Sequence, residues 1–291
     1  MLPDIELITL VLITLCAAVV NGALGYGFSS ITVPVALLFY TNRILNPALV
    51  LVEVVLNGYI LLISRKSVPV VWRRVLPIFV GLAPGIVAGS YVLSSVNPAW
   101  LKLFVFAILL PLILLQAAGV RKPVHSERIV GVPFGAGVGI LYSATTISGP
   151  PLALMFNNQG LVKQEFRAAL GLIRVAESTL TAVAYYFLGL YTTPSAQLLP
   201  WIVPSVLIGI PIGAVLIKKL DAETFRRICM SFDAWVVGFG ASRVIADLGL
   251  IEGPIAYSVL GLVVAIDTSL LYRFFMQRRL GGEASAEAWS V

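Results

Sequence analysis

Charge is scarce in this sequence. Asp, Glu, Lys and Arg make up 12% of its 291 residues, whereas about 25% of a soluble domain is charged. Hydrophobic residues account for 59%, and the mean hydropathy is +0.97. A chain of this composition cannot cover its apolar surface in water, so its solvent must be lipid. The composition excludes a soluble enzyme, a nucleic-acid-binding module and a disordered tail protein.

Residues that carry most enzymatic or metal chemistry are also few. The single histidine, His125, lies in a basic loop, and the two cysteines, Cys16 and Cys229, lie inside apolar runs, so no disulfide framework or zinc site can be built. No phosphate-binding loop or H-E-x-x-H motif is present. We therefore expect no enzymatic activity, no cofactor and no metal. The first residues, Met1 to Glu6, lack a basic region, so we also expect no cleaved signal peptide.

Long apolar runs dominate what is present. A helix needs about 20 residues to cross the hydrocarbon core of a bilayer, and seven runs have that length: 45–64, 74–94, 99–118, 168–189, 198–217, 225–245 and 253–272. Two further stretches, 5–40 and 128–158, are too long for one crossing. Small and polar residues interrupt them at 21–30 and 143–151. We predict that each of these stretches is a helical hairpin whose arms meet at an irregular tip.

The two halves of the chain resemble each other. Pro34 matches Pro151 at an offset of 117, and Glu53 matches Glu177 at an offset of 124. Pro77 and Pro84 match Pro204 and Pro211, both at 127. These offsets predict an all-α protein built from two repeats, 1–120 and 121–246, each a hairpin with a polar, Gly-Pro-containing tip plus three transmembrane helices. Residues 247–291 would add one extra helix and a cytoplasmic tail.

Basic residues predict the orientation of the repeats. They cluster at 65–74, 121–128, 163–167, 218–227 and 273–279, which the positive-inside rule assigns to the cytoplasm. The C-terminus is then inside and the N-terminus outside a bacterial inner membrane. The basic loop 65–74 corresponds to the uncharged loop 190–197, so equivalent loops face opposite sides and the repeat is inverted. Inverted repeats with interrupted helices are typical of secondary transporters, which bind substrate near the midplane.

The hairpin tips also carry a family resemblance. Asn21-Gly22-Ala23-Leu24-Gly25-Tyr26-Gly27-Phe28, which runs into Val33-Pro34, and the partner tip 143–151 resemble the sulfite exporter TauE/SafE family. So does Phe166-Arg167-Ala168-Ala169-Leu170 after the second hairpin, and the resemblance covers about 5–245. It implies transport of small sulfur-containing anions such as sulfite, sulfoacetate or other organosulfonates.

The tips are the first candidates for binding such an anion. An unwound tip presents backbone N–H groups and the positive end of a helix dipole. We therefore predict contacts to substrate from nine tip residues: Gly25, Tyr26, Gly27, Ser29, Ser30, Thr145, Thr146, Ser148 and Gly149. The alternative is that small residues here only let helices pack closely. That alternative is our expectation for the evenly spaced Gly81, Gly85 and Gly89 and for Gly131, Gly135 and Gly139.

Ionisable residues inside apolar runs are the second set of candidates: Glu53, Arg174, Glu177, Asp233 and Asp267. A charge at the centre of a membrane helix costs at least about 2.5–3.5 kcal/mol, so each needs a partner or a wet cavity. We predict that Arg174 binds the anion, with Glu53 and Glu177 as proton-coupling groups. Glu177, three residues along the same helix, would hold the guanidinium while the site is empty. The alternative is a buried structural ion pair.

Asn57 lies one turn after Glu53 and is a further candidate substrate ligand, while Thr181 holds the equivalent place in the second half.

We therefore expect a secondary membrane transporter of a small organosulfur anion that works by alternating access and is coupled to protons. A rival hypothesis is an anion channel whose hairpin tips form the selectivity filter. The expected partners are the anion, protons and the lipid bilayer, with no nucleic acid, and the sequence leaves the oligomeric state open.

Overall fold

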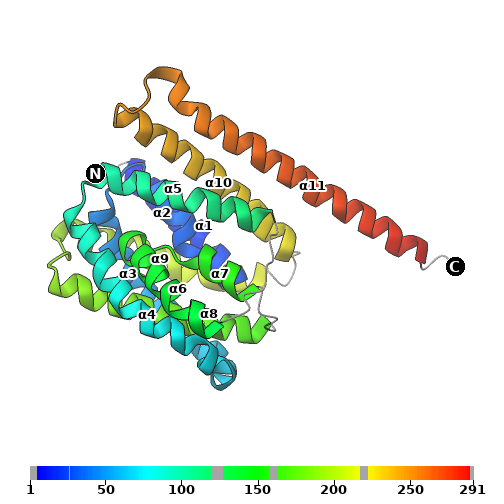
Figure 1. Cartoon of the computed structure of the whole chain (residues 1–291), viewed down its shortest axis with the longest axis horizontal. Coiled ribbons are helices and arrows are strands. Elements are labelled where there is room, and N and C mark those ends of the chain that lie inside the picture. Colours follow the sequence, from blue (N-terminus) through cyan, green and yellow to red (C-terminus); the bar gives the residue numbers. More distant parts are fainter. Residues whose placement is uncertain are drawn as a thin grey trace.

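Helices make up the regular structure of the chain (Figure 1). The computed structural model describes residues 5–25, 27–118, 127–157, 161, 163–216 and 222–288. Its helices are α1 (Ile5–Leu24), α2 (Phe28–Ala36), α3 (Asn42–Ser64), η1 (Arg65–Ser67), α4 (Val68–Ser95), α5 (Pro98–Ala117), α6 (Glu127–Thr145), α7 (Gly149–Asn157), α8 (Lys163–Phe187), α9 (Thr193–Leu216), α10 (Ala222–Asp247), η2 (Gly253–Tyr257) and α11 (Ser258–Ala288).

The predicted fold class is confirmed. Within the described ranges, six stretches are long and apolar enough to cross a membrane: Ile5–Leu24, Asn42–Ser95, Pro98–Leu115, Thr193–Leu216, Arg227–Asp247 and Gly253–Met276. The second of these contains both α3 and α4, which the short helix η1 joins. The chain is therefore an all-α, multi-pass membrane protein.

The first basic loop is shorter than the sequence predicts. We expected a loop over 65–74, but η1 follows α3 directly and α4 begins at Val68, so Arg73 and Arg74 lie on a helix. Pro69 occupies the first turn of α4. Proline is favoured there because its fixed φ suits a helix and its missing N–H has no partner to lose. The helix therefore starts ahead of the apolar run.

Each predicted hairpin consists of a long arm and a short arm. In the first hairpin the 20-residue α1 is followed by the 9-residue α2, and in the second the 19-residue α6 is followed by the 9-residue α7. Nine residues rise about 14 Å, which is roughly half of the hydrocarbon thickness. The short arms therefore place their N-terminal ends, and with them the tips, at depth within the bundle.

The first hairpin turns on glycine. Gly25 and Gly27 have φ values of 84° and 107°, in a left-handed region that residues with a Cβ adopt only at a cost. The amide of Gly25 donates a hydrogen bond of 2.7 Å to the Asn21 carbonyl and so closes α1. This arrangement is a common way to end a helix. It explains why the sequence carries two glycines at this tip.

The second hairpin turns without glycine. Thr146, just after α6, has a φ of 60°, which is a strained conformation for a β-branched residue. The Thr145 hydroxyl supports the turn because it accepts a hydrogen bond of 3.0 Å from the Ile147 amide and donates one of 2.6 Å to the Leu141 carbonyl. Side-chain hydrogen bonds thus support a left-handed turn at the second tip, whereas glycine allows that conformation at the first.

Evenly spaced glycines bring pairs of helices into close contact. A Cβ added to Gly85 of α4 would lie 2.2 Å from the Ala136 carbonyl oxygen of α6, and one added to Gly135 would lie 2.1 Å from the Ile78 oxygen. The same packing joins α1 and α9, where a Cβ on Gly213 would lie 1.9 Å from the Val19 oxygen. The spaced glycines of α4 and α6 are therefore packing residues, as we expected, and Gly213 of α9 has the same role.

The helix pairs of one half recur in the other. The long hairpin arm α1 packs against α9 of the second half, and the arm α6 packs against α4 of the first. Helices α3 and α8, which are equivalent in the predicted repeat, pack against each other. Such an exchange of partners is what two intertwined copies would produce. The inversion of the repeat across the membrane stays a prediction.

Helices α5, α10 and α11 flank this central group on one side (Figure 1). Helix α10 packs on α2 and α5, and α11 packs along α10, with its C-terminal end extending past the bundle. A buried ion pair fastens α11: the guanidinium of Arg227 lies 2.9 Å from the Asp267 carboxylate. The extra C-terminal helix is thus attached outside the central helices that carry the hairpins.

Candidate functional site

Three of the predicted ionisable residues meet where α3 and α8 cross. Glu53 comes from α3, and Arg174 and Glu177 come from α8. Their exposed fractions are 0%, 2% and 0%. Burial of three ionisable side chains among membrane helices is costly unless hydrogen bonds or opposite charges compensate. The partners of each group therefore decide what the cluster can do.

Glu53 is fully engaged. Its carboxylate accepts hydrogen bonds from the Ser29 hydroxyl at the first hairpin tip and, at 2.6 Å, from the Tyr142 hydroxyl near the second tip. One of its oxygens also lies 3.1 Å from Nη2 of Arg174. Glu53 thus ties both hairpins and α8 to α3 through a single side chain.

Glu177 is only half engaged. It accepts a hydrogen bond of 2.6 Å from the Ser148 hydroxyl, directly before α7, so it holds the second tip as Glu53 holds the first. Its other oxygen, Oε1, is buried and has no hydrogen-bond partner among the described residues. A buried acceptor without a partner is unusual, and a proton, a water or a ligand would satisfy it.

Arg174 pairs with Glu53 and not with Glu177. Our expectation that Glu177 would hold the guanidinium in the empty site is therefore wrong for this structure: spacing along one helix favoured Glu177, but the contact between helices α3 and α8 prevails. Nε and Nη1 of Arg174 are buried and make no hydrogen bond within the described residues. The guanidinium keeps donors free on two of its three nitrogens.

Other polar groups around the cluster are also unsatisfied. Asn57 donates a weak hydrogen bond of 3.4 Å to the Arg174 carbonyl, and its Oδ1 has no partner in the described part of the chain. The hydroxyl of Thr181, one turn after Glu177, is likewise buried and without a partner there. Buried atoms without a partner also occur elsewhere in the described structure, as at Asn42 and Ser90, but here they accompany a guanidinium and a carboxylate, which suits a place that exchanges water or a ligand.

Comparison with known proteins gives the family. The family model described as "Sulfite exporter TauE/SafE" matches residues 10–239. The chain belongs to the sulfite exporter TauE/SafE family. A protein of Cupriavidus necator named "Probable sulfite/organosulfonate exporter TauE" is 29% identical over 179 residues, which cover 60% of this chain and 68% of that protein. No solved structure gives a significant match.

This membership confirms the resemblance seen in the tips and supports transport as the general function. The family is one of membrane transporters, and the apolar helices agree with that role. In this TauE/SafE chain the hairpin tips and the charged cluster lie within the matched residues, whereas α11 lies beyond them. The comparisons therefore direct attention to the centre of the bundle.

The predicted tip residues of the TauE/SafE chain divide into three groups. Ser29 and Ser148 bond to the two buried carboxylates. Thr145 and Thr146 use their hydroxyls within their own turn, with Thr146 donating a bond of 2.7 Å to the Thr145 carbonyl. The third group comprises the other described tip residues: Gly25 lies beside the Arg167 side chain, Gly27 and Ser30 line a small cavity, and Gly149 opens α7. Tyr26 lies outside the described residues.

Sequence reasoning missed several partners. Tyr142 belongs to an apolar run, where an aromatic residue gives no sign of its polar end, yet it bonds to Glu53. Asn46 donates a hydrogen bond of 2.7 Å to the Ala144 carbonyl and so holds the second tip. Arg227 counted only as a basic loop residue, but it is buried against Asp267. An arginine so close to an apolar run is a signal that its side chain can turn inward.

Proposed function

We propose that this protein is a secondary transporter that carries a small organosulfur anion, such as sulfite, sulfoacetate or another sulfonate or sulfinate, by alternating access. The observation that carries the proposal is the buried Arg174, whose Nε and Nη1 are free of partners in the described structure, between two hairpin tips. The printed name of the Cupriavidus relative supports the class of substrate.

The chemistry of the cluster suits a dehydrated oxyanion. An anion that enters the centre of a membrane protein loses its water, and a guanidinium replaces part of that hydration with charge-assisted, parallel hydrogen bonds. The N-terminal ends of α2 and α7 lie at the two tips, next to Ser29 and Ser148, and add partial positive charge. Sulfite and sulfonates present several oxygens that can accept hydrogen bonds from such groups at once.

Charge balance supports proton coupling. Two carboxylates, Glu53 and Glu177, face one guanidinium, so the fully ionised cluster has a net charge of −1 before any anion arrives. Adding an anion to a buried negative cluster is unfavourable unless a carboxylate becomes neutral. Glu177, with its unbonded oxygen, takes a proton as the anion binds, and Glu53 does so when the anion displaces it from Arg174.

Ligand binding to the purified protein tests the proposal. A ligand that binds the folded state raises its thermal stability, so sulfite, sulfonates, sulfinates, carboxylates and sulfate can be compared as a panel. We expect one of the sulfur anions to stabilise the protein, and Arg174→Lys to weaken its binding at least tenfold because the fork geometry is lost. Arg227→Lys is the matched control, since it changes another buried, paired arginine away from the tips.

The control separates a binding role from a structural one. If Arg174→Lys and Arg227→Lys both lower stability while anion affinity stays normal, Arg174 is a structural ion-pair partner and the proposed site is wrong.

Transport into liposomes then tests coupling: Glu177→Gln should keep anion binding and lose part of the pH dependence of transport. Fast passive flux that ignores a proton gradient would favour the channel hypothesis instead.

A further inference from the structure

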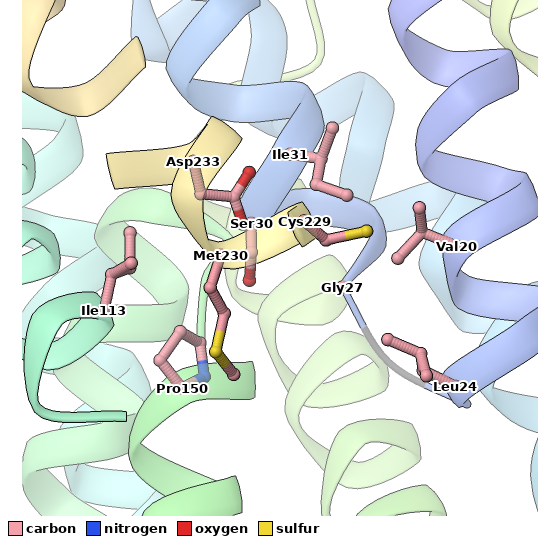
Figure 2. A pocket seen from close by; sticks show the side chains of 10 residues that line it. All are labelled: Val20, Leu24, Gly27, Ser30, Ile31, Ile113, Pro150, Cys229, Met230 and Asp233. Carbon is pink, nitrogen blue, oxygen red and sulfur yellow. The ribbon is translucent and has the colours of Figure 1, made fainter. Parts of the chain in front are cut away.

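A third buried carboxylate lies beside the hairpin tips, away from Glu53 and Glu177. Asp233 comes from α10, is 7% exposed, and its Oδ1 has no hydrogen-bond partner in the described structure. Figure 2 shows its carboxyl group pointing from α10 toward Ser30 of α2. In the predicted repeat its counterpart on α5 is Leu109, so this carboxylate belongs to one half only.

Asp233 faces a cavity between the two hairpins. Gly27 and Ser30 line it from the first tip, Pro150 from the second, and Cys229 from α10 (Figure 2). Its volume is about 30 Å³, enough for about one or two waters. Among the described lining residues, Asp233 and Ser30 supply the side-chain oxygens, whereas a calcium ion takes about six to eight oxygens. These two side chains offer too few oxygens for such an ion, and the cavity has room for water.

The elements packed around Asp233 offer little to neutralise it. Helices α2 and α7 contain no ionisable residue, and α1 contains only Glu6 near its start and Cys16. Lys102 of α5 lies toward another cavity and donates to the Leu37 carbonyl, while Asp267 of α11 is paired with Arg227. Cys229 is the other titratable residue among the described residues that line the cavity. None of these described side chains is placed to balance an ionised Asp233, so a bound proton is what would keep it neutral.

The same cavity borders the N-terminal end of α2. Gly27 caps that helix without a side-chain hydrogen bond to its first amides, and Gly27 and Ser30 both line the cavity, so the first turn of α2 borders it. Free amides and the helix dipole attract an anion to this end. An ionised Asp233 repels that anion, whereas a protonated Asp233 donates a hydrogen bond to it.

We propose that Asp233 is a proton-binding residue of the anion site and that an anion binds at the first tip only when this carboxyl group carries a proton. The proton comes from the acid form of the buffer in the surrounding solution, which becomes its conjugate base, and it stays on the carboxyl oxygen while the anion is bound, so anion and proton move together. This inference rests on the proposed anion transport and adds to it a proton carrier separate from Glu53 and Glu177.

Calorimetry counts this proton. Anion binding measured in buffers of different ionisation enthalpy gives the number of protons taken up per anion. We expect Asp233→Asn, which mimics the protonated side chain, to bind the anion with one proton fewer than the wild type. Its affinity at alkaline pH should exceed that of the wild type at least tenfold. Asp267→Asn is the matched control because it changes another buried aspartate and should leave the proton count unchanged.

Infrared spectroscopy tests the proton without any anion. We expect the purified wild type at neutral pH to show a carbonyl band of a protonated carboxyl group that Asp233→Asn removes and Asp267→Asn retains. An unchanged band and an unchanged proton count in Asp233→Asn would overturn the inference, even if anions bind. If no anion binds the wild type, the proposed transport fails, and the band still decides whether Asp233 holds a proton.

Cys229 lies in the cavity wall, so its thiol can report on the cavity while Asp233 is left unchanged. In a Cys16→Ser background, a small aqueous thiol reagent should modify Cys229, and an anion bound at the first tip should slow that reaction several-fold because Gly27 and Ser30 of that tip border the same cavity. Equal rates with and without an anion that demonstrably binds would place the anion elsewhere and overturn the role of Asp233. This measurement holds even if Asp233→Asn does not fold.

Discussion

The first hairpin turns on Gly25 and Gly27 in left-handed conformations, whereas the second turns on a left-handed Thr146. Both tips nevertheless reach the same kind of partner, because Ser29 bonds to Glu53 and Ser148 bonds to Glu177. Glycine makes the first turn without strain, and hydrogen bonds hold the second in place. The two tips thus share a contact while differing in the backbone that presents it.

The charges around the two tips differ more than the turns do. Glu53 has Arg174, Tyr142 and Ser29 as partners, while Glu177 has Ser148 and one oxygen without a partner in the described residues. Asp233 lies near the first tip alone. Protonation therefore has unequal consequences in the two halves: at Glu53 it removes an ion pair, and at Glu177 it removes a charge with no direct counter-ion.

The comparison of the two tips assumes that the two halves are inverted copies. A test of membrane topology can disprove that assumption. Reporter fusions at Ser67, in η1, and at Thr193, at the start of α9, mark equivalent connections of the two halves. We expect opposite compartments, with Ser67 cytoplasmic, because basic residues surround it and none surrounds Thr193. Both reporters on one side would remove the inversion and the argument for alternating access by repeat symmetry.

Replacing each glutamate in turn measures the difference between the tips. Glu53→Gln leaves a buried guanidinium without a counter-charge, which should lower the free energy of unfolding by about 3–5 kcal/mol. Glu177→Gln keeps an acceptor for Ser148 and should cost no more than about 1 kcal/mol. Thermal unfolding in detergent measures both. Equal losses would mean that the two carboxylates are equivalent despite their different partners.

Much of this architecture could be predicted because lipid imposes it. The thickness of the bilayer sets the length of each apolar run, so the spans at 45–64 and 99–118 correspond closely to α3 and α5. The two hairpins could be recognised as apolar runs that are too long for one crossing and have small and polar residues at their centres. Glu53, Arg174 and Glu177 stood out because charge is expensive in hydrocarbon.

Pairing between helices could not be predicted in the same way. Sequence spacing brings Glu177 one turn from Arg174, but the contact across α3 and α8 gives the guanidinium to Glu53. Tyr142 and Asp233 acquire their surroundings only from the packing of α6 and α10 on neighbours distant in the chain. Local patterns therefore identified which residues are costly, while the tertiary structure decided what compensates each of them.

Thiol accessibility sharpens the comparison at the tips themselves. In a background lacking Cys16 and Cys229, we expect Ser29→Cys and Thr146→Cys both to react with small aqueous reagents and both to be protected by the anion. The first should react several-fold faster, because its neighbours Gly27 and Ser30 line a cavity. Complete inertness of both positions would mean that the tips are buried packing and not a binding site.

The smallest expected effects concern the two turns, and they should have opposite signs. Gly27→Ala places a Cβ on a residue with a φ of 107°, so we expect a loss of about 1 kcal/mol in the free energy of unfolding. Thr146→Gly relieves a left-handed β-branched residue, a strain of about 1–3 kcal/mol, while losing one hydroxyl bond to the Thr145 carbonyl.

The net change for Thr146→Gly should therefore be zero or a small gain. The free energy of unfolding of both variants, measured in detergent, tests these signs. Gly137→Ala of α6 is the control because a Cβ there meets nothing within 4 Å. Destabilisation by Thr146→Gly as large as that by Gly27→Ala would show that the threonine side chain, rather than its backbone conformation, holds the second tip. If the gain is real and anion affinity falls with it, the strain at Thr146 is retained because it presents Ser148 and α7 to the site.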